Sequence, residues 1–360
     1  MDLKLLNKIF AGIVFVISFI VLFNTVQPSV SFWDCGEFIA ASVSLQVPHP
    51  PGTPFFLILG NIFSKLPIGE NLGYRVNMIS VLSSALSVLL LYLIAVKLIE
   101  NYKGKKAENM FEAIATYVSA AVGALAFSFS DTFWFNGVEA EVYAFSTFLF
   151  AAVTYLIIRW NERADNKDSE KYILMIAYLI GLATGVHLMS VLATVPVVMI
   201  IMFKKYVNDE EALKKTSYIF LGHAVAILLL AIFWRSGEKS QTPPSPEEYQ
   251  SFDTKFKIFI VVISALIMGV YWKKIFTRNS FYMPLIIGGI ALFATYPGVV
   301  KFLPELMTKI GGDNNVIEVF ILLLLFAGLG YGVFYARKNS KPTLHLIFMS
   351  FIFILVGFLT

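Results

Sequence analysis

The sequence predicts an all-α membrane protein that crosses the bilayer many times, and three observations lead to this fold class. Of the 360 residues, 58% are hydrophobic and only 14% are charged, so the chain is far more apolar than a soluble domain of this length. Apolar runs long enough to cross a bilayer, about 17–25 residues each, recur from one end to the other. Basic residues flank these runs instead of forming one stripe, which excludes a nucleic-acid partner. The chain is therefore predicted to be a single membrane domain over residues 1–360.

Each apolar run is predicted to form one membrane helix. The first run is longer than a secretory signal and lacks a small-residue cleavage site, so we predict a retained helix. Residues 172–203 exceed one helix and lack a polar loop, so we place a break at Gly185–His187. The last run ends at Thr360 without a charged anchor, which we interpret as a truncated chain. The predicted helices, about eleven in all, lie near residues 9–26, 75–97, 113–130, 142–158, 172–186, 188–203, 216–234, 257–272, 281–297, 316–336 and 343–360.

The basic residues predict the orientation of the chain. With the amino terminus in the cytoplasm, most of the 28 basic residues fall in cytoplasmic loops, as the positive-inside rule requires. The break at Gly185–His187 keeps Lys204 and Lys205 on that side, whereas a single helix would invert every later loop. The loops predicted on the outer side are residues 27–74, 131–141, 235–256 and 298–315.

Four carboxylates fall in the first two outer loops. Asp34 and Glu37 lie in FWDCGEF, and Glu139 and Glu141 lie in FWFNGVEAEVYAF. Both stretches join Trp-containing apolar sequence to a new helix, which places the acids at the outer membrane surface beside an aromatic belt. Glycosyl transfer needs a carboxylate that takes the proton from an acceptor hydroxyl, and groups that stabilise a leaving phosphate. Acids at this surface suit a site that holds a lipid-linked substrate and a water-soluble one together.

A structural interpretation of the same acids stays open. Asp34-x-x-Glu37 has the spacing of a helix capping box, and Glu139 and Glu141 fit a solvated helix start. Capping by one residue does not exclude catalysis by another.

Two histidines and two arginines are further candidate substrate-binding residues. His49 lies in QVPHPPGTPFF, where prolines fix a tight extended turn near the same outer surface as Asp34. His187 lies at the predicted break, where an imidazole in apolar surroundings needs a partner. Arg75 and Arg235 fall at outer helix ends and are candidates for holding a lipid phosphate, with snorkelling to lipid headgroups as the alternative.

Other classes of site find no support. Cys35 is the single cysteine, which excludes an internal disulfide and a cysteine-based metal cage. The sequence has no spacing typical of metal ligands, no P-loop and no dinucleotide glycine fingerprint. We therefore assign no metal ligand and no certain cofactor, although an acidic outer loop can bind a divalent cation.

Three stretches together resemble a known family. SFWDCGEFIAASVSLQVPHPPGTPFF, WFNGVEAEVYAF and GLATGVHLMSVL resemble the integral-membrane protein O-mannosyltransferase-like family, which is widespread in Bacteroidetes and has an animal member that modifies plexins. That family is similar to the GT-C glycosyltransferases. The resemblance covers residues 1–200 through motifs and the remainder through topology alone.

The resemblance implies a GT-C-like bundle with short helices in the first outer loop, in a bacterial inner membrane with its active site on the periplasmic face. It implies an inverting transferase that moves mannose or a similar hexose from a polyprenyl-phosphate carrier to Ser or Thr hydroxyls of secreted proteins. By motif, Asp34 is the base, Glu37 its neighbour in acceptor or sugar binding, and Glu139 and Glu141 the second-loop acids. His187 matches a Gly-x-x-x-Gly-x-His element. Many members carry a soluble carboxy-terminal region that we expect to be absent here.

Three other functions stay open. The acceptor can be a lipid or a glycan instead of a protein. A transporter or flippase of polyprenyl-linked sugars is the alternative from another class, but such proteins usually have charged or broken helices at mid-membrane, and the predicted helix centres here lack Asp and Glu. A membrane scaffold without chemistry explains the four acids only as caps.

Overall fold

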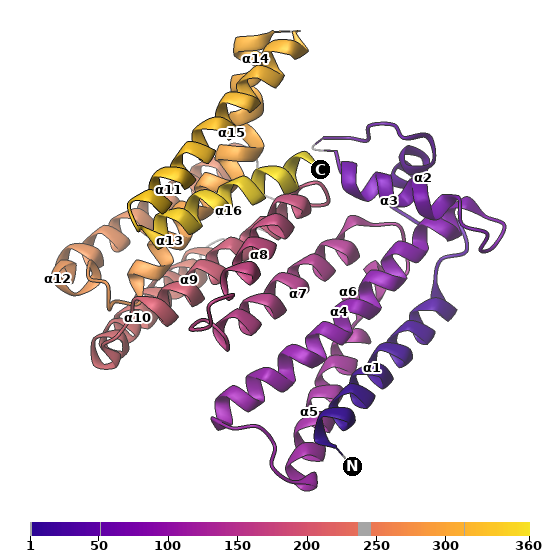
Figure 1. Ribbon diagram of the computed structural model, residues 1–360, viewed down its shortest axis with the longest axis horizontal. Coiled ribbons are helices and arrows are strands. Elements are labelled where there is room, and N and C mark those ends of the chain that lie inside the picture. Colours follow the sequence, from indigo (N-terminus) through magenta and orange to yellow (C-terminus); the bar gives the residue numbers. More distant parts are fainter. Residues whose placement is uncertain (1, 51, 237–245, 313) are drawn as a thin grey trace. The chain divides into compact units, whose positions relative to one another are not determined.

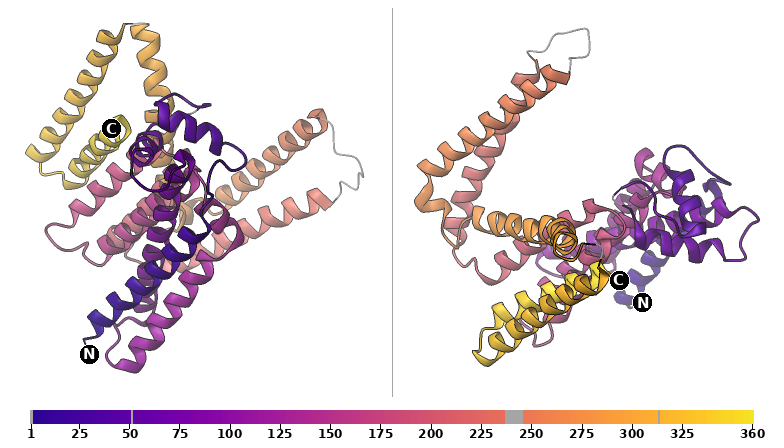
Figure 2. Two further views of the ribbon diagram at one scale, coloured as in Figure 1. Left: turned by 90° about the vertical axis from the view of Figure 1, so that its right-hand side faces the viewer. Right: turned by 90° about the horizontal axis from the view of Figure 1, so that it is seen from above.

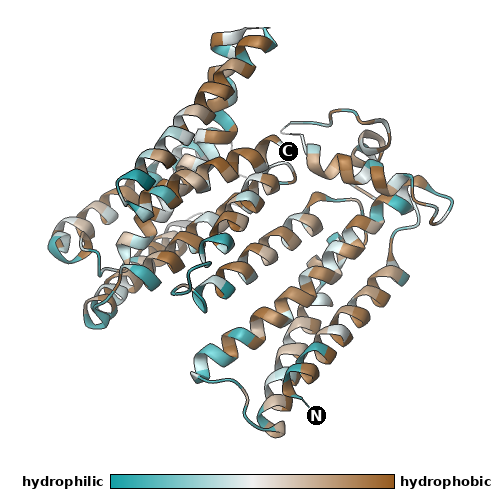
Figure 3. Cartoon of the chain, in the orientation of Figure 1, coloured by the Kyte–Doolittle hydropathy of each residue, from teal (hydrophilic) through white to brown (hydrophobic). Residues whose placement is uncertain are grey.

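The computed structural model describes residues 2–50, 52–236, 246–312 and 314–360, and these residues form helices without any strand (Figure 1). The predicted all-α class is confirmed. Within the described residues, nine helical segments are long and apolar enough to cross a membrane. Apolar residues line the helices, and hydrophilic residues gather at helix ends and in loops (Figure 3).

The helices follow one another along the chain with short connections. Their bounds are α1 Leu3–Thr25, α2 Cys35–Ser44, α3 Pro54–Ser64, α4 Leu72–Lys103, α5 Met110–Ser128, α6 Asp131–Gly137, α7 Val142–Asn161, α8 Glu170–Thr184, η1 Leu188–Ala193, α9 Thr194–Lys205, α10 Glu210–Ser236, α11 Pro246–Val270, α12 Trp272–Ile275, α13 Tyr282–Phe293, η2 Ala294–Phe302, α14 Leu303–Gly311, α15 Asn315–Lys338 and α16 Pro342–Leu359.

All the predicted membrane helices fall on helical segments, and the predicted break is present. Helix α8 ends at Thr184 and the 3₁₀ segment η1 begins at Leu188. With 15 residues, α8 is shorter than the candidate spans. The stretch predicted as an outer loop at 298–315 is largely helical instead. The reason is that Pro297 lies inside the π-helical segment η2, whose wider turn accommodates a residue that normally breaks an α-helix.

The chain divides into two compact units, one formed by Met1–Thr194 with Leu292–Thr360 and the other by Val195–Ala291. Each unit is described by itself below. The single membrane domain over residues 1–360 stays a prediction.

Helix α4 is the centre of the first unit, where it packs against α1, α5 and α7 (Figure 1). Asn71 caps its start by accepting a hydrogen bond from the backbone N–H of Gly73, and Gly104 ends it in a left-handed conformation. Near the far end of the helix, the Tyr92 hydroxyl donates to Asn7 Oδ1 at 2.7 Å. Contacts of this kind hold α4 against its neighbouring helices, and the first two predicted outer loops connect these helices.

Two short helices, α2 and α3, lie in the first predicted outer loop, in agreement with the expected fold. Asn61 of α3 donates its amide to the backbone oxygens of Ser42 and Val43 at the end of α2. The backbone N–H of Phe55 donates to Gly185 O at 2.9 Å, just after α8. These bonds join α3 to α2 and hold the start of α3 against the residue that follows α8.

The second unit contains the long antiparallel pair α10 and α11, which Figure 2 shows side by side. His223 of α10 joins this pair to α13. Its Nε2 lies 2.9 Å from Ser264 Oγ of α11, and its Nδ1 lies 3.3 Å from the Tyr282 hydroxyl. Pairing the imidazole in this way satisfies a polar group in apolar surroundings.

Candidate active site

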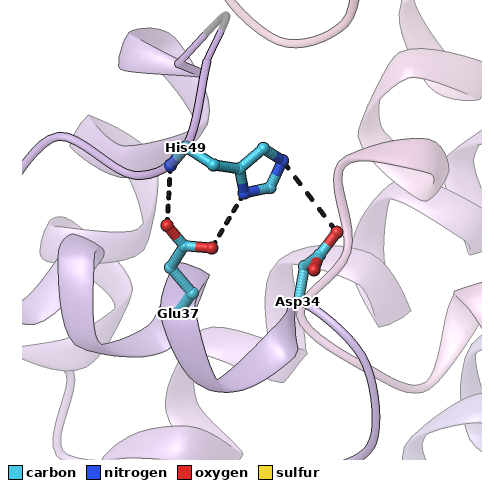
Figure 4. Close-up of side chains that lie close together, drawn as sticks. All are labelled: Asp34, Glu37 and His49. Carbon is cyan, nitrogen blue, oxygen red and sulfur yellow. Dashed lines mark hydrogen bonds and ion pairs between the residues drawn. The ribbon is translucent and has the colours of Figure 1, made fainter.

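Asp34, Glu37 and His49 meet at the start of α2 (Figure 4). The Glu37 carboxylate accepts from the backbone N–H of His49 at 2.6 Å and lies 2.8 Å from its ring Nδ1. The other ring nitrogen, Nε2, lies 4.0 Å from Asp34 Oδ2. All three side chains are open to solvent, with exposed fractions of 56% for Asp34, 43% for Glu37 and 47% for His49.

The capping box that the spacing of Asp34 and Glu37 allows does not form. Asp34 occupies the cap position of α2, but its side chain makes no capping hydrogen bond, and Glu37 is engaged with His49 instead. The preceding residue, Trp33, has a φ of 60°, an uncommon left-handed conformation for a bulky side chain, of the kind that clusters at functional sites. The local backbone thus presents the Asp34 carboxylate to solvent.

Glu139 and Glu141 are buried, with exposed fractions of 1% and 6%, so the expectation of a solvated helix start is wrong. Ser31 Oγ donates to Glu139 Oε2 at 2.6 Å, and Cys35 Sγ donates to Glu141 Oε1 at 3.6 Å. The backbone oxygen of Glu141 also accepts from Ser80 Oγ of α4. These contacts join the second loop to the first and to α4, and the two pairs of acids differ in their exposure to water.

The charges of the site follow from this arrangement. Burial, followed by the negative charge of Asp34, raises the pKa of Glu141 to about 7. Burial likewise raises the pKa of the Cys35 thiol to about 12, which keeps it protonated and unreactive. The hydrogen bond between Glu37 and His49 lowers the pKa of the carboxyl and raises that of the imidazole.

His187 contacts a different set of residues. It caps η1 by accepting on Nδ1 a hydrogen bond from the backbone N–H of Met189 at 3.2 Å, and its ring packs on Tyr143 with the ring centres 5.1 Å apart. Burial lowers its pKa. The partner that this histidine needs is therefore a local backbone group.

Arg75 is occupied by the backbone of the first loop. Its guanidinium donates to the carbonyl oxygens of Ser64, Ile68 and Gly69 at 2.9–3.2 Å. These bonds bind the chain that links α3 to α4. The side chain of Arg235 lies outside the described residues.

Sequence reasoning missed the residues that hold the site together. Asn77 is fully buried in α4 and donates to the backbone oxygens of Gln27 and Ser29, which anchors the first loop. Ser31 and Cys35 reach the second-loop acids. An isolated amide inside the apolar run of α4 was the one available signal, whereas nothing in the sequence marks Ser31 or Cys35.

Asp34, Glu37 and His49 also have the composition of a cation site, since one ligand atom from each lies within 4.8 Å of the others. Exposed acidic groups of this kind occur commonly without an ion. Glu37 and His49 already satisfy each other by hydrogen bonds, so we assign no metal to the group.

Comparison with known proteins shows what this segment is similar to. Residues 34–210 match the family model of the protein O-mannosyl-transferase TMEM260 N-terminal domain. The predicted resemblance to the O-mannosyltransferase-like family is confirmed. The matched segment of this chain begins at Asp34 and contains the four loop acids, His49 and His187.

Two relatives extend this finding. The chain is 26% identical over 205 residues to mouse protein O-mannosyl-transferase TMEM260, covering 57% of this chain and 27% of the mouse protein. It is 25% identical over 162 residues to the Dictyostelium discoideum protein O-mannosyl-transferase tmem260, covering 44% of this chain and 18% of that protein. The chain thus spans about a quarter or less of the length of these relatives. No solved structure matches it.

Proposed function

We propose that this protein is a glycosyltransferase that moves mannose or a similar hexose from a polyprenyl-phosphate carrier to Ser or Thr hydroxyls of proteins. The observation that carries the proposal is the exposed Asp34 carboxylate beside Glu37 and His49, in a site whose two second-loop acids are buried. The names of the two TMEM260 relatives support mannose as the sugar and protein as the acceptor.

Asp34 is the proposed general base. As the acceptor oxygen attacks the anomeric carbon, the bond from that carbon to the carrier phosphate breaks and the hydroxyl proton passes to the Asp34 carboxylate. Attack opposite to the leaving group inverts the configuration of the sugar. An exposed carboxylate suits this task because both substrates reach it from outside the protein.

Glu37, Glu139 and Glu141 have supporting roles in this proposal. Glu37 holds His49 and thereby shapes the acceptor side of the site. The buried pair fixes the second loop through Ser31 and Cys35. Since Glu141 has a pKa of about 7, a large fraction of it is neutral at physiological pH, which limits the repulsion that Asp34 experiences.

The site is proposed to face the outer side of the membrane, with the amino terminus inside. The positive-inside distribution of basic residues supports this orientation. A polyprenyl-phosphate sugar would enter from the bilayer and a secreted protein from the aqueous side. The named relatives are eukaryotic, so a bacterial inner membrane stays a prediction based on the family resemblance.

The deciding experiment measures sugar transfer in membranes that carry the full-length protein, with polyprenyl-phosphate mannose and a Ser/Thr-rich secreted acceptor. We expect Asp34→Asn to lower kcat by at least about 100-fold, because the base is lost, while the protein remains folded and still binds donor. Asp131→Asn, in the same predicted outer region, is the matched control.

Two outcomes would contradict the proposal. If Asp34→Asn transferred sugar at the wild-type rate, Asp34 would not be the base. If the wild type transferred no sugar but moved the carrier lipid across the bilayer, the flippase alternative would replace the transferase.

A further inference from the structure

The imidazole of His49 is held in one orientation from two directions. Glu37 binds both its backbone N–H and its Nδ1, at 2.6 and 2.8 Å, and its ring packs against Phe38 with the ring centres 5.8 Å apart. Its Nε2 is consequently directed toward Asp34 (Figure 4). The oriented nitrogen therefore faces the proposed base.

The distance between the Asp34 carboxylate and the His49 imidazole leaves room for one bridging oxygen atom. Asp34 Oδ2 and His49 Nε2 are 4.0 Å apart, which is too long for a direct hydrogen bond. An oxygen about 2.8 Å from each atom, a normal hydrogen-bond length, fits this separation with an angle of roughly 90° at the oxygen. One hydroxyl group can therefore bridge the two side chains.

We propose that Asp34 Oδ2 and His49 Nε2 together form a two-point seat for the acceptor hydroxyl, with Glu37 fixing the imidazole. This inference rests on the proposed transferase function and adds to it the way in which the acceptor is recognised. His49 contacts the nucleophilic oxygen, and Glu37 is a positioning residue that acts through His49.

The hydrogen bonds that the acceptor hydroxyl can make determine which nitrogens of His49 must carry a proton. A hydroxyl has one hydrogen to donate, and the Asp34 carboxylate is an acceptor only. The second partner must therefore donate to a lone pair of the hydroxyl oxygen, which requires a hydrogen on Nε2. Because Nδ1 already donates to Glu37, the imidazole must carry both protons. During transfer the hydroxyl proton moves to Asp34, the oxygen bonds to the sugar carbon, and the carrier phosphate leaves.

The charged neighbours favour this doubly protonated form. The hydrogen bond from Glu37 is the largest influence that raises the pKa of His49, and the charges of Glu37, Asp34 and Glu141 add to it, while desolvation opposes them. These acids come from both elements that face the ring, α2 and the second loop. Loss of the Nε2 proton at higher pH should remove the donor and weaken acceptor binding.

The test compares kcat/KM for a seryl peptide acceptor as a function of pH, using the full-length protein in membranes. The wild type should lose kcat/KM on the basic side as His49 deprotonates. Glu37→Gln should move this basic limb to lower pH, because it removes the group that raises the pKa of His49.

Two substitutions of His49 itself extend the test. His49→Gln should abolish the basic limb, since an amide donates at every pH. His49→Phe should lower kcat/KM for the acceptor by about 10- to 100-fold and leave the KM for the donor unchanged.

His345→Gln is the matched control, because His345 lies at the start of α16 and serves no role in the seat. It should leave the pH profile and both KM values unchanged. If His49→Phe retained the wild-type acceptor KM and basic limb while Asp34→Asn abolished transfer, the seat would be wrong and the proposed function would stand.

A second readout does not depend on transfer. In the purified full-length protein labelled with ¹⁵N-histidine, the His49 ring should titrate at lower pH in Glu37→Gln than in the wild type. The seryl peptide alone should shift its Nε2 resonance, and an alanyl peptide should not. Equal responses to the two peptides would overturn the seat. If Mg²⁺ alone shifted this resonance and competed with the peptide, the three residues would be a cation site and the seat would likewise be rejected.

Discussion

At the scale of single residues, burial divides four carboxylates that the sequence presents as two similar pairs. Asp34 and Glu37 are exposed beside His49, whereas Glu139 and Glu141 are nearly inaccessible to water. Environments that separate the protonation of neighbouring acids are typical of sites that need one charged and one neutral carboxyl group. The proposed division into an exposed base and a buried support follows from this difference.

The buried carboxyl group of Glu141 makes stability depend on pH. Burial raises its pKa in the folded state from the ordinary value of 4.5 to about 7, so the folded state binds the proton more tightly than the unfolded state does. The wild type should lose stability as the pH rises from about 4.5 to about 7, by an amount of order 3 kcal/mol. Glu141→Gln should remove this loss and unfold at a higher temperature than the wild type at pH 8, with a small difference at pH 5.

Thermal unfolding in detergent at these two pH values measures the effect. Glu305→Gln, at an exposed position of α14, is the control and should leave the pH dependence unchanged. A Glu141→Gln variant whose unfolding temperature falls between pH 5 and pH 8 as far as that of the wild type would show that Glu141 does not carry the proton.

At the scale of the helices, close backbone contact joins α8 to α16. A Cβ added at Gly181 would lie 2.1 Å from the backbone oxygen of Ile354, and one added at Gly357 would lie 2.2 Å from that of Tyr178. Glycine is thus required on both helices at their contact. The carboxy-terminal run α16 is in this way tied to the helix that ends beside η1 and His187.

Gly181→Ala should therefore destabilise the protein, even though alanine is the better helix former by about 1 kcal/mol. The backbone of α16 must move to admit the methyl group, so we expect a lower unfolding temperature and partial loss of protein in membranes. Gly123→Ala is the matched control, because a Cβ there meets nothing within 4 Å. Equal unfolding temperatures for the two variants would contradict the packing argument.

At the scale of the first unit, the site lies at the opposite end of the helices from the basic residues at the start of α1 and at the ends of α4 and α7. Helix α1 begins with Lys4 and Lys8, and α4 and α7 end near Lys103 and Arg159. The site lies instead where α1 ends and where α4 and α7 begin. This separation is what the positive-inside rule predicts for an outer active site.

Labelling with a membrane-impermeant maleimide tests this orientation. The native Cys35 is buried and should not react. Val47→Cys and Tyr102→Cys place a thiol at positions exposed by 89% and 94% at the two ends. In intact cells only the first should be labelled, and both should be labelled after the membrane is opened. Labelling of Tyr102→Cys alone in intact cells would invert the orientation.

The helices are predictable from the sequence alone, because crossing a bilayer needs long apolar runs and these are local properties of the chain. The break before η1 and the motifs that resemble the O-mannosyltransferase-like family are also local features of the sequence. Its helix boundary at Pro297 was wrong, since the rule that proline ends a helix takes no account of the π-helical turn that accommodates it.

The exposure and the pairing of the acids, in contrast, depend on how the chain folds in three dimensions. Glu37 meets His49 across 12 positions of the chain, and Ser31 meets Glu139 across 108. No local pattern encodes such pairs, because they depend on how α2, α3 and the second loop pack onto α4. The physical reason is general: hydrophobic length and period act within one segment, whereas burial, and with it the pKa of a carboxyl group, is a property of several segments packed together.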